Sequence, residues 1–478
     1  MKKEYSIKRA ALINASGKYS TILLQLFVNA ILSRILTPDD YGIVAVITVF
    51  STLFISLSDM GFGAAIIQQK DLTKEEIDGI FTITIFIAIT LALIFSGASF
   101  FIAEFYNNCV YICLGILLSI SLLFNALNMV PNGIMNRNKK FMIIAVRTVC
   151  AYAVSALIAI IVAYLGGKYY AIVIQTMFSS IVIFLWNVFE TRPRIRIKGC
   201  VHSVSKVINY SGYQFAFTMV NYFSRNLDNL LTGKFMGNAA LGYYNKAYTL
   251  MLYPINNLTG IISPVLHPLL SDYQKNKEII YKKYIIIVKI LALIGVFIGP
   301  FCYFASNEII MILYGKQWGD SIKCFEILSF AILPQLIGSS AGSIYQSLGK
   351  TKLLFYNGVL NTIITIIAIL IGVLIGKNIM VLSKYVACAY IIHFITVYFM
   401  LVHIGFEYQF LVFLKELIPE IVILLLMIAF IFTVNISYNN IIVSFFMKFI
   451  VLGVYFVVIL FITGEFKILV GIIHKNSK

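Results

Sequence analysis

Residues 441–463 read IIVSFFMKFIVLGVYFVVILFIT, and Lys448 is the single charged residue in this run. An α-helix of about 20 apolar residues crosses the hydrocarbon core of a bilayer. Runs of this kind recur along the chain, so that the candidate spans are 10–36, 41–66, 79–103, 109–131, 141–164, 168–189, 207–232, 242–268, 284–306, 321–347, 353–375, 381–403, 417–435 and 441–463. The pattern predicts an all-α polytopic membrane protein with about 14 transmembrane helices, or about 12 if the last two runs are reassigned.

The composition excludes a water-soluble enzyme. Of 478 residues, 60% are hydrophobic and 12% are charged, whereas soluble domains have about 45–50% apolar and about 25% charged residues. The seven cysteines have no C-x-x-C spacing, the five histidines form no H-E-x-x-H, and the chain has no Walker-type glycine loop. We therefore expect no metal, no cofactor, and no catalytic or ATPase site.

The basic residues report on topology. The net charge is +17, but Lys and Arg lie in short clusters between apolar runs, which favours membrane topology over nucleic-acid binding. With the N-terminus inside, the cytoplasmic segments hold 24 Lys and Arg, and the outer connections hold only Lys168, Lys234, Lys316 and Lys377. We therefore expect an even number of spans and both termini in the cytoplasm.

The chain also contains an internal repeat. Four matches occur in chain order: 14–17 with 209–212, 40–42 with 241–243, 137–140 with 349–352, and 167–168 with 376–377. Two lobes of repeated topology around a central cavity are a recurrent transporter arrangement. The predicted organisation is an N-terminal lobe of spans 1–6 (1–190), a basic cytoplasmic linker (191–206), a C-terminal lobe of spans 7–12 (207–404), and spans 13–14 with a cytoplasmic tail (405–478).

Polar residues form stripes on the first helices of both predicted lobes. A charge in hydrocarbon costs at least about 2.5–3.5 kcal/mol, so these faces should meet protein or water. The candidate substrate-binding residues of the cavity are Lys18, Gln25, Asn29, Asp59, Gln214, Asn221, Arg225, Asp228 and Lys246.

Structural interpretations of the same residues stay open. The neutral side chains could join packed helices by hydrogen bonds. Arg225 and Asp228, one helical turn apart, could form an inert ion pair. Lys246 and Arg147 could extend toward the interface, and Arg34, opposite the stripe on the first helix, is interpreted as an interface anchor.

Five runs carry a family resemblance. They are 32–42 (LSRILTPDDYG), 58–68 (SDMGFGAAIIQ), 226–235 (NLDNLLTGKF), 241–248 (LGYYNKAY) and 314–318 (YGKQW). They resemble the polysaccharide transporter family, the O-antigen and capsule repeat-unit flippases of the multidrug/oligosaccharidyl-lipid/polysaccharide exporter superfamily. The resemblance covers most of residues 10–400.

The resemblance implies a transporter rather than an enzyme. Such proteins move an undecaprenyl-pyrophosphate-linked oligosaccharide from the inner to the outer leaflet of the bacterial cytoplasmic membrane by alternating access. It also implies a V-shaped fold of two lobes, with a cavity lined chiefly by spans 1, 2, 7 and 8. Arg and Lys there would bind pyrophosphate, and Tyr and Asn would bind sugar hydroxyls. This chain departs from that pattern because span 1 offers only Lys18 as a cation. Membrane lipids, a polymerase and a chain-length protein are the expected partners, and nucleic acid is not.

Three other functions compete with this interpretation. A cation-coupled multidrug exporter of the same superfamily should have a net acidic cavity, whereas the candidate residues include Lys18, Arg225 and Lys246 against two acids. A lipid II flippase would use the same chemistry on another headgroup. A membrane-embedded polysaccharide polymerase would need a sizeable outer loop, and no connection exceeds 17 residues. Coupling to protons or sodium stays open at this point.

Overall fold

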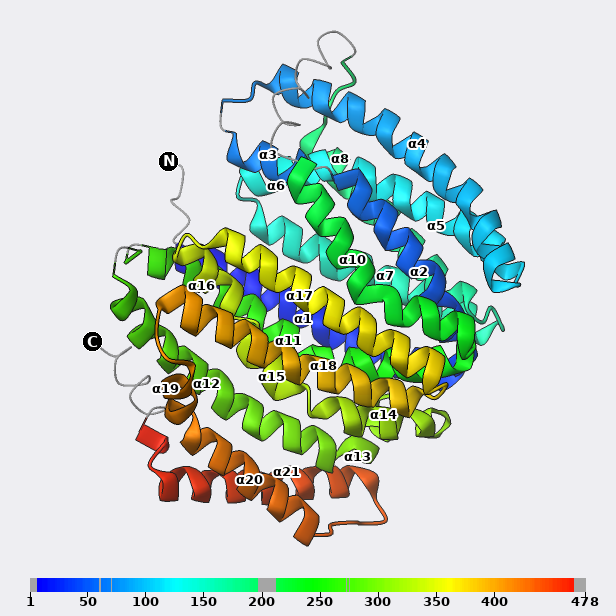
Figure 1. Cartoon of the computed structure of the whole chain (residues 1–478). Helices are drawn as coiled ribbons and strands as arrows, with labels where there is room; N and C mark the ends of the chain where they lie inside the picture. The colour runs from blue at the N-terminus through cyan, green and yellow to red at the C-terminus, as the bar shows by residue number, and fades with distance from the viewer. Residues whose placement is uncertain are drawn as a thin grey trace. The chain divides into compact units, whose positions relative to one another are not determined.

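The computed structural model describes residues 7–59, 62–69, 71–196, 212–271, 273–274 and 276–467. All regular secondary structure in these ranges is helical (Figure 1). The chain divides into two compact units, unit 1 (Met1–Gly242) and unit 2 (Tyr243–Lys478). Unit 1 contains α1 (Ile7–Ile35), α2 (Pro38–Asp59), α3 (Phe62–Gln68), α4 (Lys74–Tyr106), α5 (Val110–Leu127), α6 (Met129–Arg137), α7 (Phe141–Tyr164), α8 (Tyr170–Thr191) and α10 (Gly212–Phe235). Unit 2 contains most of α11 (Asn238–Ser271), then α12 (Lys277–Phe304), α13 (Ser306–Leu313), η1 (Lys316–Trp318), α14 (Gly319–Ser329), α15 (Ile332–Gly338), α16 (Ala341–Ser347), α17 (Thr351–Leu370), η2 (Ile371–Ile375), α18 (Ile379–Phe399), η3 (Met400–Phe406), α19 (Phe410–Glu416), α20 (Ile418–Thr433) and α21 (Ile441–Thr463).

The helices confirm an all-α polytopic membrane protein. Within the described ranges, nine helices are long and apolar enough to cross a membrane, and the number is eleven if two bent helix pairs each count as one span. The helices α1, α10 and α11, with 29, 24 and 34 residues, are long enough but are not among these. They are the helices that carry most of the predicted cavity residues, whose polar side chains lower the hydropathy. The count of fourteen spans stays a prediction.

Short polar motifs define where two of the helices begin. At α2, Thr37 Oγ1 donates to Asp40 Oδ2 at 2.7 Å, and the Asp40 backbone N–H donates back to Thr37 Oγ1 at 3.2 Å. At α4, Thr73 and Glu76 form the equivalent capping box. These side chains satisfy backbone N–H groups that the first helical turn leaves without acceptors.

Two glycines let the starts of α2 and α11 touch within unit 1. A Cβ on Gly42 would lie 1.8 Å from the carbonyl oxygen of Asn238, and a Cβ on Gly242 would lie 2.0 Å from that of Pro38. These glycines come from the matched repeat segments 40–42 and 241–243. The contact is therefore reciprocal, and only residues without a side chain fit both positions.

The core of unit 1 joins α2, α4 and α5 on one side and α1, α7 and α8 on the other. Phe95, Tyr111 and Leu114 are fully buried in the first cluster. In the second, small residues of α7, Ala156 and Ala159 among them, pack against α1 and allow close approach of the two helices. The helix α10 packs on α2, so the compact unit ends at Gly242. The division into lobes 1–190 and 207–404, inferred from the repeat, stays a prediction.

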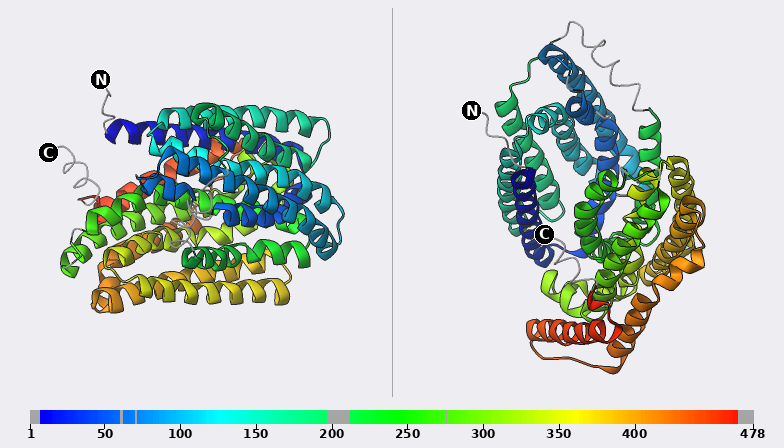
Figure 2. Two further views of the ribbon diagram at one scale, coloured as in Figure 1. Left: turned by 90° about the horizontal axis from the view of Figure 1, so that it is seen from above. Right: turned by 90° about the vertical axis from the view of Figure 1, so that its left-hand side faces the viewer.

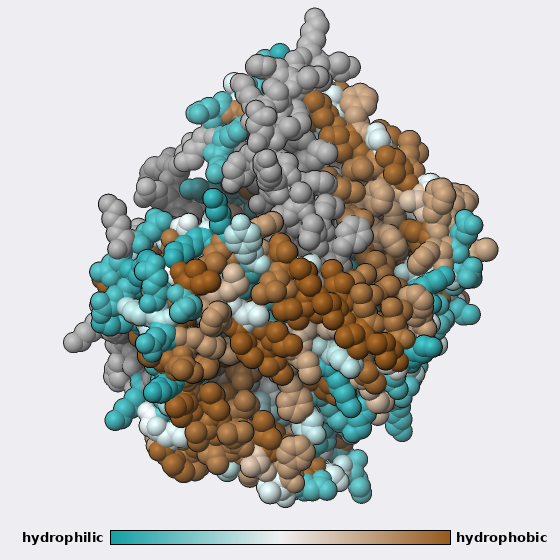
Figure 3. All heavy atoms as spheres, in the orientation of Figure 1, coloured by the Kyte–Doolittle hydropathy of each residue, from teal (hydrophilic) through white to brown (hydrophobic). Residues whose placement is uncertain are grey.

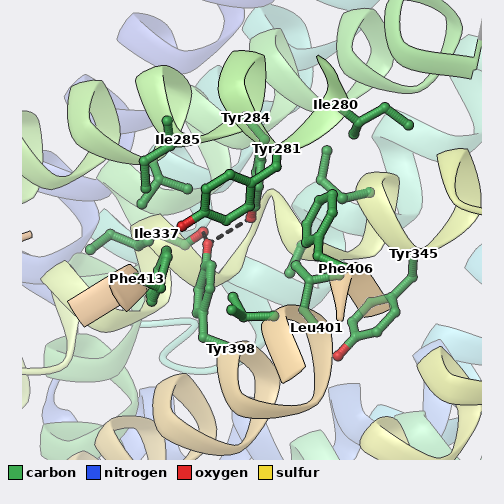
Figure 4. Close-up of a cluster of buried hydrophobic side chains, with 14 of the residues drawn as sticks. Ile280, Tyr281, Tyr284, Ile285, Ile337, Tyr345, Tyr398, Leu401, Phe406 and Phe413 are labelled. Atoms are coloured by element: carbon green, nitrogen blue, oxygen red, sulfur yellow. Dashed lines mark hydrogen bonds between the residues drawn. The ribbon is translucent and has the colours of Figure 1, made fainter. Parts of the chain in front are cut away.

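Unit 2 is built around α12. A buried cluster there links α12, α15 and α18 (Figure 4): the hydroxyls of Tyr284 and Tyr398 are 2.7 Å apart, and that of Tyr398 donates to the Ile337 carbonyl at 2.9 Å. The surface that α17 and α18 present is largely apolar (Figure 3), with exposed residues such as Tyr356 and Ile363. Exposed apolar side chains at this density are expected where a membrane protein meets lipid.

The last two helices, α20 and α21, form a hairpin at the C-terminal end of unit 2 (Figure 2). Lys448, the single charge of α21, is buried: its Nζ lies 2.7 Å from Glu308 Oε1 and donates to the Phe304 carbonyl at 2.8 Å. Ser444 Oγ also donates to Glu308 at 2.7 Å. The charge that interrupts this apolar run therefore anchors α21 to α13, because both ionised groups have partners.

Candidate substrate-binding residues on the polar helices

The structure groups the predicted cavity residues by helix. On α1, Lys18 is exposed, and Gln25 and Asn29 are half-buried. Lys18 is thus the exposed cation of this stripe, and the two amides lie farther along the same helix. Asp59 ends α2, and its side chain lies outside the described part of the structure.

On α10, the side chains of Gln214 and Asn221 also lie outside the described part. Arg225 is exposed, whereas Asp228 is buried and accepts a hydrogen bond from the Asn229 backbone N–H at 2.8 Å. No ion pair joins Arg225 to Asp228 among the described side chains. The ion pair considered from their spacing is therefore not formed, and the Arg225 guanidinium is left accessible.

The second half of α10 is held in place by side chains of α4 and α10 itself. Tyr106 of α4 donates to the Leu230 carbonyl at 3.0 Å, and Tyr222 donates to the Val49 carbonyl of α2. Lys234 donates to the Phe105 carbonyl, with its ammonium 4.5 Å from the centre of the Phe105 ring. These contacts fix the segment that carries Arg225 and Asp228 on unit 1, so Arg225 projects from a rigid element.

Lys246 lies in a different environment, on α11 in unit 2. It is only 6% exposed, and its ammonium lies 4.5 Å from the Tyr314 ring centre and 5.3 Å from that of Trp318. Ser321 Oγ donates to the Tyr243 carbonyl at 2.9 Å beside it. Two of the family-like runs, 241–248 and 314–318, therefore meet at this lysine. Cation–π contacts compensate part of its desolvation.

Arg147 is a residue whose environment the sequence did not indicate. It does not extend to the interface but is 5% exposed, and its Nη1 donates to Asn187 Oδ1 at 2.5 Å. Asn132 Oδ1 lies 3.4 Å from the same nitrogen, and Asn187 Nδ2 donates to Asn128 Oδ1 at 2.6 Å. This amide cluster joins α6, α7 and α8, and no carboxylate neutralises Arg147 within the described residues. Asn128 and Asn132 lie one helical turn apart, but Arg147 and Asn187 lie on later helices, so the sequence gave no common signal.

The accessible cations among the described candidates are Lys18 and Arg225, one on each of two polar helices. A guanidinium offers planar paired donors and an ammonium a point charge, and both suit phosphate oxygens. The structure contains no group of three or more His, Cys, Asp or Glu side chains that could hold a metal, in the residues it describes. The chemistry that these helices can support is thus recognition of an anion and of hydroxyl groups.

Comparison with known proteins places this arrangement in a family. Residues 31–323 match a family described as "Polysaccharide biosynthesis protein". The chain is 23% identical over 311 residues to the teichuronic acid biosynthesis protein TuaB of Bacillus subtilis, covering 65% of this chain and 64% of that one, slightly under two thirds. It is 24% identical over 354 residues to the lipopolysaccharide biosynthesis protein WzxC of Escherichia coli, covering 72% of this chain and 70% of that one.

The fold is similar to a solved structure of the lipid II flippase MurJ in an inward closed conformation. The TM-score is 0.72 at 16% identity, over 94% of this chain and 98% of that chain. This likeness shows the fold, and the sequence match over more than half of the chain shows the family. The chain therefore belongs to the family described as "Polysaccharide biosynthesis protein".

Proposed function

We propose that this protein flips an undecaprenyl-pyrophosphate-linked oligosaccharide, the repeat unit of an O-antigen, capsule or related exopolysaccharide, from the inner to the outer leaflet by alternating access. In this proposal α1, α10 and α11 are the three spans that complete the fourteen. Their polar faces, together with the end of α2, line a central cavity of Lys18, Gln25, Asn29, Asp59, Gln214, Asn221, Arg225, Asp228 and Lys246.

One observation supports an anionic cargo above all. Arg225 is exposed on a polar helix beside a buried Asp228 with which it forms no ion pair. A cation kept accessible on a helix of a membrane protein carries a cost that a ligand can offset. Lys18, exposed on α1, adds a second positive charge of the same accessibility.

The rival functions differ in the charge and shape of the cargo. A cation-coupled multidrug exporter would need accessible acids, yet Asp228 is buried. A lipid II flippase would need the same phosphate-binding cations and differs only in the sugar. Because this chain is similar in fold to MurJ, the experiment below also tests lipid II flipping.

The test is restoration of surface polysaccharide in a strain that lacks its own repeat-unit flippase, normalised to the amount of membrane-inserted protein. Arg225→Ala and Lys18→Ala should each lower export at least several-fold, and Arg225→Lys should retain part of it because a point charge still attracts phosphate. Arg34→Ala is the matched control, since Arg34 is an exposed arginine whose Nη1 donates to the Ala30 carbonyl of its own helix at 3.1 Å.

Full export by an Arg225→Ala, Asp228→Asn double variant would refute the ligand role of Arg225. Restored growth of a strain depleted of its lipid II flippase would favour that alternative, and drug resistance without polysaccharide would favour the multidrug exporter. The proposal also places both termini in the cytoplasm of a bacterium, in its inner membrane, with a polymerase and a chain-length protein as partners.

A further inference from the structure

Three charged side chains meet inside unit 2, away from the polar helices. Lys289 of α12 has its Nζ 3.9 Å from Oε1 of Glu420, in the first turn of α20, and 4.0 Å from Oε1 of Glu465, in the turn after α21. Glu420 is 2% exposed, and Glu465 is also buried. Both oxygens of Glu420 and Oε2 of Glu465 lack a hydrogen-bond donor among the described residues. The cluster therefore holds two buried carboxyl groups that one lysine serves at long range.

The charges of this cluster do not balance if all three groups are ionised. One ammonium against two carboxylates leaves one negative charge in a poorly solvated site, which is strongly unfavourable. Two carboxyl groups that share a site ionise in sequence for the same reason. One bound proton makes the cluster neutral: a Lys289 ammonium, one carboxylate and one carboxylic acid.

Another buried glutamate of the same unit shows what an ionised group requires here. Glu308 accepts from Ser444 Oγ at 2.7 Å, and Lys448 Nζ lies 2.7 Å from its Oε1. Lys289 stays outside ordinary hydrogen-bond distance of Glu420, which for N–H···O is at most about 3.2 Å. The contrast indicates that Glu420 is not held as a carboxylate.

The other groups around Glu420 do not change this balance. Lys289 faces it from α12 and Glu465 from the turn after α21, whereas Glu416 of α19 accepts from the Tyr281 hydroxyl at 3.2 Å. The position of Glu420 in the first turn of α20 favours a carboxylate through the helix dipole. That effect is small beside the desolvation of an ion that accepts no hydrogen bond.

We propose that Glu420 and Glu465 share one exchangeable proton, so that this cluster is a proton-binding site in which Lys289 balances the remaining carboxylate. A metal cation fits less well, because hard cations take about six or more oxygen ligands and the ammonium repels them. Lys289 keeps 19% of its side chain exposed, so the site is not completely enclosed by protein. Loss of the proton leaves a surplus negative charge where α12, α20 and the end of α21 meet.

Infrared difference spectroscopy of the purified full-length protein tests the proposal directly. The wild type should show a carboxylic acid carbonyl signal near neutral pH that disappears at alkaline pH. Because the proton is shared, Glu420→Gln and Glu465→Gln should each remove that signal. Glu407→Gln is the matched control, since Glu407 is exposed, with Lys277 Nζ 2.6 Å from its Oε1, and its pKa is lowered by that contact.

Lys289→Met should bind a second proton and about double the signal, because no ammonium remains to balance a carboxylate. Absence of the signal in the wild type, or its persistence in either Glu420→Gln or Glu465→Gln, would overturn the proposal. A Lys289→Met protein without the gain would overturn the charge balance on which it rests.

Stability gives a second readout with a defined sign. The folded protein keeps a proton that the unfolded chain releases above the ordinary glutamate pKa of about 4.3, so stability should fall as pH rises from about 5 toward neutral. Glutamine resembles the protonated acid, so Glu420→Gln should fold and show a flatter pH dependence, while Glu407→Gln should keep the wild-type slope. An unchanged pH slope in Glu420→Gln contradicts the proposal. If Glu420→Gln does not accumulate, the pH slope of Glu465→Gln is measured instead, and an unchanged slope there also contradicts the proposal.

Discussion

Replacing Gly42 with alanine should force apart the starts of α2 and α11. The added Cβ would lie 1.8 Å from the carbonyl oxygen of Asn238, whereas real Cβ atoms essentially never approach closer than 3.0 Å. The two backbones must therefore separate by roughly the missing 1.2 Å. Overpacking of this kind costs about 1–3 kcal/mol. We expect the upper part of that range, because the opposing atom belongs to backbone and has no rotamer to change.

The assay is the free energy of unfolding in detergent, together with the amount of protein inserted in the membrane. Gly97→Ala is the control: Gly97 lies inside α4 with nothing within 4 Å of its would-be Cβ, so alanine should stabilise the helix by about 0.5–1 kcal/mol. Gly242→Ala should resemble Gly42→Ala, and the double variant should lose less than the two single losses combined, because one separation relieves both clashes. A Gly42→Ala protein as stable as Gly97→Ala would refute the reciprocal contact.

Three further predictions follow from the charges. Lys448→Met should destabilise the protein by about 3–5 kcal/mol, because it leaves the buried Glu308 carboxylate without its cation. Adding Glu308→Gln to the same chain should recover most of the loss. Chemical unfolding of the single and double variants measures both effects, and equal stability of Lys448→Met and the wild type would contradict the prediction. Reporter fusions after Asn440 and after Lys478 should report opposite sides of the membrane, and the same side for both would exclude the fourteen-span topology. An inside-negative membrane potential favours outward movement of an anionic cargo by about 2.3 kcal/mol per elementary charge per 100 mV. Collapsing the potential in proteoliposomes should therefore slow flipping. An unchanged rate would argue against this driving force.

The positions of the helices were predictable because bilayer thickness sets the length of an apolar run. The runs 141–164 and 441–463 coincide with α7 and α21 at both ends. Breaks inside a run were not predictable in this way. The run 321–347 covers most of α14 and all of α15 and α16, because hydropathy counts apolar residues and does not register a change of helix direction.

The environment of each candidate charge was harder to predict than its helix. The spacing of Arg225 and Asp228 allows an ion pair, but one side chain points outward and the other is buried. Lys246 faces aromatic rings that lie far away in the sequence. Helical periodicity gives the face on which a residue lies, whereas its partner depends on which other helix covers that face.

The buried charges of this protein therefore separate into classes that only the packing reveals. Lys448 and Glu308 neutralise each other at 2.7 Å. The Tyr314 ring offsets part of the desolvation of Lys246 through a cation–π contact. Glu420 has neither a close cation nor a hydrogen-bond donor among the described residues. Each of the first two arrangements gives its buried charge a fixed partner that offsets part of the desolvation cost. A carboxyl group without such a partner is most stable when it is neutral, which is why the exchangeable proton is expected on the C-terminal helices and not at the well-paired anchor of α21.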